Sequence, residues 1–123
     1  MGFLFDPAKI KEAESNYSKL KLTPYQKGVV YESAKVLSEK LNMSELAARG
    51  FIGFAIKDWQ QEDKILAEEH YRLDPQGQRD ALKRMHVLFY RRVSRIVPEN
   101  QRKKLEDTLM ETYKLMLAAY KLI

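Results

Sequence analysis

Residues 47–55 read AARGFIGFA and open the clearest apolar pattern of the chain. From residue 48 to residue 73 apolar side chains recur at spacings of three and four, as on one face of an amphipathic helix. The positions are Ala48, Ile52, Ala55, Trp59, Leu66 and Leu73. Gly50 and Gly53 each lower helix propensity by roughly 1 kcal/mol. We interpret them as the place where another backbone packs closely, with a flexible hinge as the alternative.

Prolines divide the rest of the chain into further helices. Asp6-Pro7, Thr23-Pro24 and Asp74-Pro75 each place an N-cap residue before a proline at the first helical position, where the missing N–H is tolerated. Ser44 is a fourth N-cap candidate, and Pro98 ends or kinks a helix. The expected helices are 7–20, 24–41, 45–72, 75–97 and 99–122.

These helices predict an all-α fold. No alternating strand pattern persists, and the sequence lacks the Asn-Gly and Asp-Gly pairs typical of hairpins. A chain of 123 residues has the size of one domain, so we expect a single helical-bundle domain over 1–123. Short connections favour antiparallel neighbours and hence a compact up-and-down bundle of about five helices. The expected core includes Trp59, Phe89, Leu109 and Met116.

Composition excludes several classes of chemistry. The chain has no cysteine, which removes disulfides, cysteine-ligated zinc and thiol nucleophiles. Phosphate-binding loops and the common dinucleotide, zinc-protease and serine-hydrolase motifs are also missing, so no cofactor is expected. No apolar run approaches the roughly 20 residues that span a bilayer, and the start does not resemble a secretory signal. We therefore expect a cytoplasmic protein without a membrane partner.

The positive charge is concentrated in one segment. The chain carries a formal net charge of +5, and residues 79–96, RDALKRMHVLFYRRVSRI, hold six basic residues and one acidic residue. The remainder has 16 basic and 16 acidic residues and is neutral. A local excess of this kind is a better indication of a nucleic-acid surface than a diffuse one.

The first functional hypothesis is binding of RNA or DNA by the basic helix. Arg84, Arg91 and Arg95 share one line on a helical wheel, and arginine forks suit phosphate oxygens. Further along, Arg102, Lys103 and Lys104 could extend the patch over residues 79–104. The alternative is a solvated face that is partly paired with acids of the helix predicted at 45–72.

A second hypothesis is catalytic. Arg79 and His86 lie two turns apart on one helical face, with Lys83 and Tyr90 on the same line. This stretch resembles the arginine–polar–spacer–histidine motif of HEPN ribonucleases, with Asp80 as the polar residue. The resemblance covers Arg79 to His86 and implies metal-independent RNA cleavage by those two residues in a compact helical protein. The alternative is a hydrogen-bonded structural histidine.

A third hypothesis is a metal or small-ligand site inside the bundle. Glu62 and Glu69 interrupt the apolar face of the helix predicted at 45–72, His70 is adjacent, and Glu32 lies in line with apolar residues of the helix at 24–41. Inward carboxylates can bind a divalent metal. However, neither histidine has a glutamate three residues before it. The alternative is edge carboxylates paired with the basic helix.

The C-terminal stretch LMLAAYKLI, residues 115–123, is apolar around most of a helix. A surface helix needs only one apolar stripe, so this end is either central to the bundle or covered by a second subunit. The sequence thus favours a homo-oligomeric, non-enzymatic helical module that binds nucleic acid or acts as a protein-interaction subunit. The HEPN-like ribonuclease using Arg79 and His86 is the alternative.

Overall fold

A computed structural model describes residues 2–62 and 74–122, without the side chains of Tyr25 and Glu62. Within these residues the protein is an all-α bundle and contains no strand. The α-helices are α1 (Pro7–Tyr17), α2 (Pro24–Leu41), α3 (Glu45–Glu62), α5 (Pro75–Val93) and α6 (Arg102–Ala119). Two short 3₁₀ turns, η2 (Ser94–Ile96) and η3 (Glu99–Gln101), connect α5 to α6. The predicted all-α fold is confirmed, while the end of the helix predicted at 45–72 lies outside the described residues.

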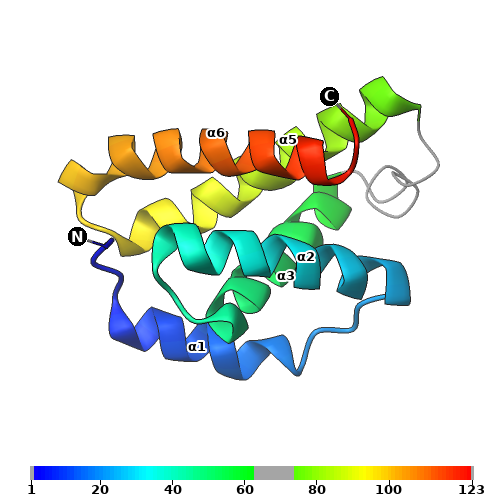
Figure 1. Ribbon diagram of the computed structural model, residues 1–123. Coiled ribbons are helices and arrows are strands. Elements are labelled where there is room, and N and C mark those ends of the chain that lie inside the picture. The colour runs from blue at the N-terminus through cyan, green and yellow to red at the C-terminus, as the bar shows by residue number, and fades with distance from the viewer. Residues whose placement is uncertain (1, 63–73, 123) are drawn as a thin grey trace.

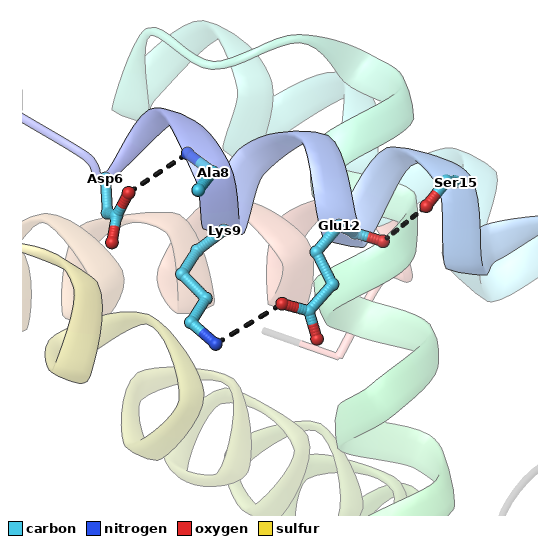
Figure 2. Close-up of polar contacts among 5 residues, drawn as sticks. All are labelled: Asp6, Ala8, Lys9, Glu12 and Ser15. Atoms are coloured by element: carbon cyan, nitrogen blue, oxygen red, sulfur yellow. Dashed lines mark hydrogen bonds and ion pairs between the residues drawn. The ribbon is translucent and has the colours of Figure 1, made fainter.

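Each predicted N-cap makes the expected hydrogen bond. Asp6 Oδ1 accepts from the Ala8 amide at 3.0 Å, as Figure 2 shows, and Asp74 Oδ1 accepts from Gly77 at 2.7 Å. Thr23 and Gln26 form a reciprocal capping box, and Ser44 Oγ accepts from the Ala47 amide at 3.1 Å. These bonds satisfy amide groups that a helix leaves unpaired at its start, which is why the caps locate the helix starts.

Helix α3 is the centre of the bundle because it packs against α1, α2 and α5. In Figure 1 it runs behind α2, between α1 below and the α5–α6 pair above. A Cβ on Gly50 would lie only 2.7 Å from the Ala13 carbonyl carbon of α1. A Cβ on Gly53 would meet the Leu20 side chain. The close-packing interpretation of Gly50 is thus confirmed, because the α1 backbone occupies the space of a side chain.

The predicted core residues are all buried. Trp59, Phe89, Leu109 and Met116 belong to the buried hydrophobic residues of the bundle. Phe89 of α5 meets Phe51 of α3 edge to face, with ring centroids 6.4 Å apart. Such a pair adds specific geometry to the area that the two rings bury.

The C-terminal segment is covered on one side by the bundle itself. Met116 and Leu117 are buried, but Ala119 and Tyr120 are exposed. The chain turns back at Lys121, whose φ is 56°, and the Leu122 amide donates to the Leu117 carbonyl at 2.8 Å. The turn ends the helix and brings the Leu122 side chain into a buried position. Leu115 stays exposed, and the predicted homo-oligomer stays a prediction.

No helix within residues 2–62 and 74–122 has the length and apolar character that crossing a membrane requires.

Candidate functional site

The predicted arginine line runs along α5 and continues into η2. Arg91 and Arg95 are exposed, whereas Arg84 is half-buried. Arg84 and Arg91 both interact with other residues of the chain. Arg95 is therefore the member of the line whose side chain the described structure leaves most available to a ligand.

Arg92, the neighbour of Arg91, has a structural partner. Its Nε and Nη2 each donate a 2.7 Å hydrogen bond to the Asp58 carboxylate of α3. The guanidinium carbon also lies 5.0 Å from the Phe54 ring centroid. The hydrogen bond that Arg92 donates to Asp58 raises the pKa of Arg92 above its usual value, against the opposing effect of partial burial. This pairing of the basic helix with α3 is the one anticipated by the solvated-face alternative.

The extension residues meet Arg95 where the chain reverses between α5 and α6. We call Arg95, Arg102, Lys103 and Lys104 the basic corner; all four side chains are exposed. Arg102 Nε donates to the Ser94 carbonyl at 3.2 Å, which holds this side chain beside Arg95. The connection through Val97 and Pro98 is short, so two segments seven residues apart form one surface.

Each lysine of the basic corner contacts another side chain. Lys103 makes a 3.0 Å ion pair with Asp107 one turn away, and the hydrogen bond with Asp107 raises the pKa of Lys103. Both members of this pair are largely exposed, so water and salt screen it. Lys104 Nζ lies 5.0 Å above the Phe3 ring, which fixes the N-terminal segment against the same corner.

Helix α6 begins with cations where an anion would be favoured. Its first turn holds Arg102, Lys103 and Lys104 and no acidic residue, and Gln101 provides no side-chain cap. The amino end of a helix carries a partial positive charge, so these cations oppose the helix dipole. An anion bound here would relieve that repulsion as well as pair with the side chains.

One more cation joins this surface from α1. Lys9 and Arg95 line the same pocket of about 170 Å³, which also contacts Phe54 and Arg92. Figure 2 shows Lys9 and Glu12 leaving the same side of α1, with Nζ 3.3 Å from the Glu12 carboxylate. The sequence did not single out Lys9, because nothing local to α1 reveals that it packs beside η2.

The proposed catalytic pair occupies different environments. Arg79 donates from Nη1 to the Leu122 carbonyl and from Nη2 to the Gln76 side chain, both at 2.9 Å. His86 is 6% exposed, and its Nδ1 lies 2.9 Å from the Leu82 carbonyl oxygen. Burial lowers the pKa of His86, and the bond to the Leu82 carbonyl only partly offsets that effect. A buried histidine bonded to the backbone fits the alternative interpretation of His86 as a structural residue. Catalysis of RNA cleavage by Arg79 and His86 stays a prediction.

The His86 side chain lines a pocket of about 240 Å³ between α5 and α6. The wall is mostly apolar and includes His86, Val87, Tyr90, Leu109, Met110 and Tyr113. The Tyr113 ring meets the His86 ring edge to face, with centroids 5.6 Å apart. The sequence pattern had no signal for this pocket, since its two walls come from different helices.

Only part of the predicted metal site lies within the described residues. Glu32 is exposed on α2, and the side chain of Glu62 as well as Glu69 and His70 lie outside the description. In the part of the chain that the structure describes, no three histidine, aspartate or glutamate side chains are grouped as a metal would require. The hypothesis therefore stays a prediction.

Comparisons of this chain with protein-family models, with curated proteins and with solved structures find no match.

Proposed function

We propose that this protein binds RNA or DNA through its basic corner. The observation that carries the proposal is the position of Arg102 and Lys103, exposed in the first turn of α6, close to the exposed Arg95 of η2, whose neighbour Ser94 accepts a hydrogen bond from Arg102. Arginine and lysine side chains at a helix amino terminus provide both charge and N–H donors for phosphate oxygens.

The mode of binding follows from the kind of contact. Contacts to phosphates position a protein on a nucleic acid but carry no sequence information. Three such contacts predict a log–log dependence of affinity on salt with a slope of about −2 to −3. Binding would thus be weak and tolerant of sequence, with added support from Lys104 or Lys9 at the edge of the surface.

The experiment is fluorescence anisotropy of labelled single-stranded RNA and DNA over a salt series. The test variant replaces Arg95, Arg102 and Lys103 with glutamine. We expect weaker binding to every sequence and a flatter salt slope, with an unchanged far-UV spectrum.

A matched control replaces three exposed lysines elsewhere, Lys11, Lys35 and Lys114, with glutamine and removes the same formal charge. This control should bind nearly as well as the wild type, because the corner is intact. Equal losses in the two variants would indicate only a response to net charge, and no binding by the wild type would end the proposal.

The same samples test the ribonuclease alternative. RNA cleavage that persists in EDTA and disappears in His86→Ala would support the catalytic pair of Arg79 and His86. Intact RNA with a salt-dependent anisotropy change would support binding alone.

A further inference from the structure

The pocket between α5 and α6 contains a buried hydrogen-bonding atom without a partner. His86 Nε2 is buried and has no hydrogen-bond partner among the described residues. The Leu82 carbonyl oxygen can only accept, so Nδ1 of His86 carries the proton that lies between them. In the neutral ring this leaves Nε2 as an acceptor, and a buried acceptor without a donor is costly.

The rest of the wall selects for an apolar body. Val87, Leu109 and Met110 line the pocket beside the aromatic rings of Tyr90 and Tyr113. Tyr113 already donates its hydroxyl to the Arg79 carbonyl at 3.1 Å. Lys83 and Glu106 are the charged residues of the lining, and both are exposed. An occupant therefore contacts mainly apolar and aromatic groups. A hydrogen-bond donor on the occupant can bond to His86 Nε2.

We propose that this pocket binds a small neutral aromatic molecule that carries one hydroxyl or N–H donor, with phenol as the simplest example. The ring occupies the apolar space and the donor bonds to His86 Nε2. An apolar cavity of about 150 Å³ is enough for benzene, so this pocket of about 240 Å³ has room for one substituted ring. The proposal is independent of nucleic-acid binding, because no residue of the basic corner lines the pocket.

Entry of the donor requires a wall side chain to turn, since Nε2 is closed to water. Met110 is 50% exposed and Lys83 is exposed. Both side chains are unbranched and have several rotatable bonds, so they change rotamer at little cost.

The test compares phenol with toluene, which has the same shape but lacks the donor. Titration of the ¹⁵N-labelled protein should shift signals of Val87 and Met110 with either molecule. Only phenol should also shift the His86 Nε2 ring signal toward that of a hydrogen-bonded acceptor. His70 is the other histidine of the chain, so loss of a signal in His86→Phe assigns the ring.

His86→Phe keeps an aromatic ring and removes the acceptor. The preference for phenol relative to toluene should fall about fivefold, which corresponds to about 1 kcal/mol for one neutral hydrogen bond. Met110→Trp places a larger side chain in the pocket from an exposed position. It should weaken the binding of phenol and of toluene to the same extent. An unshifted His86 signal in phenol, or an equal phenol preference in His86→Phe, would overturn the proposal. Unchanged binding by Met110→Trp would place the site elsewhere and overturn it as well.

Discussion

Arg92 and Asp58 join α5 to α3 through two parallel hydrogen bonds, each 2.7 Å long. Two adjacent arginines of the basic stretch thus have different roles, since Arg91 is exposed and Arg92 lies across the helix interface. The planar guanidinium matches both carboxylate oxygens, which a lysine ammonium cannot do.

Arg92→Lys should therefore destabilise the protein although the charge is kept. We expect a loss of about 1 kcal/mol in the free energy of unfolding, since the pair is partly exposed and solvent screens its charge. Urea denaturation measures the change, with the exposed Arg95→Lys as the matched control. Similar stability of the two variants would show that the bidentate geometry contributes nothing.

Gly50→Ala should be strongly destabilising. The added Cβ would lie 2.7 Å from the Ala13 carbonyl carbon, so α1 must shift away from α3. Overpacking of this kind costs about 1–3 kcal/mol or more. Gly28→Ala is the control, because no atom lies within 4 Å of its new Cβ and the exposed helix position should gain up to about 1 kcal/mol. Thermal unfolding of both variants should show opposite shifts in Tm.

Acid should destabilise the fold through His86. Burial lowers the pKa of His86 in the folded protein, so the unfolded chain takes up a proton first as the pH falls below about 6.5. By linkage, the free energy of unfolding then decreases toward lower pH, by at most about 1.4 kcal/mol per pH unit for one proton. Lys83 and Glu106 are the charged residues that line the same pocket as His86, and they carry opposite charges.

Urea unfolding at about pH 7.5 and about pH 5.5 tests this linkage. His86→Phe should lose less stability between the two pH values than the wild type, since other titrating groups are common to both proteins. An identical pH dependence would mean that His86 has the same pKa folded and unfolded.

The C-terminal turn predicts two opposite effects at adjacent residues. Leu122→Ala removes a buried side chain and should cost about 2 kcal/mol or more. Lys121→Gly places glycine where φ is 56° and should be neutral or stabilising by up to about 1 kcal/mol. Denaturation midpoints check both, and a destabilised Lys121→Gly protein would contradict the left-handed conformation of this residue.

Local rules were enough to predict the capped helix starts and most of the core, whereas α1 and α5 end earlier than predicted, at Tyr17 and Val93. Asp6, Thr23, Ser44 and Asp74 act as caps through hydrogen bonds to amides two or three residues away. Such contacts depend on neighbouring sequence alone, which is why the helix starts could be predicted. Helical periodicity likewise identified Trp59 and Phe89, because burial of one helix face repeats with the turn of the helix.

The candidate sites depended on contacts between helices, which the sequence pattern does not encode. Arg92 rather than Arg91 meets Asp58, and Lys9 joins Arg95, only because of how α1, α3 and α5 cross. The pocket at His86 exists because α6 supplies its second wall. A helical wheel gives the direction of a side chain from its own axis, but its partner is set by the packing of other helices. The sequence by itself thus determined the capped helix starts and most of the buried positions, and the tertiary structure decided which polar groups pair, which stay exposed and where a ligand fits.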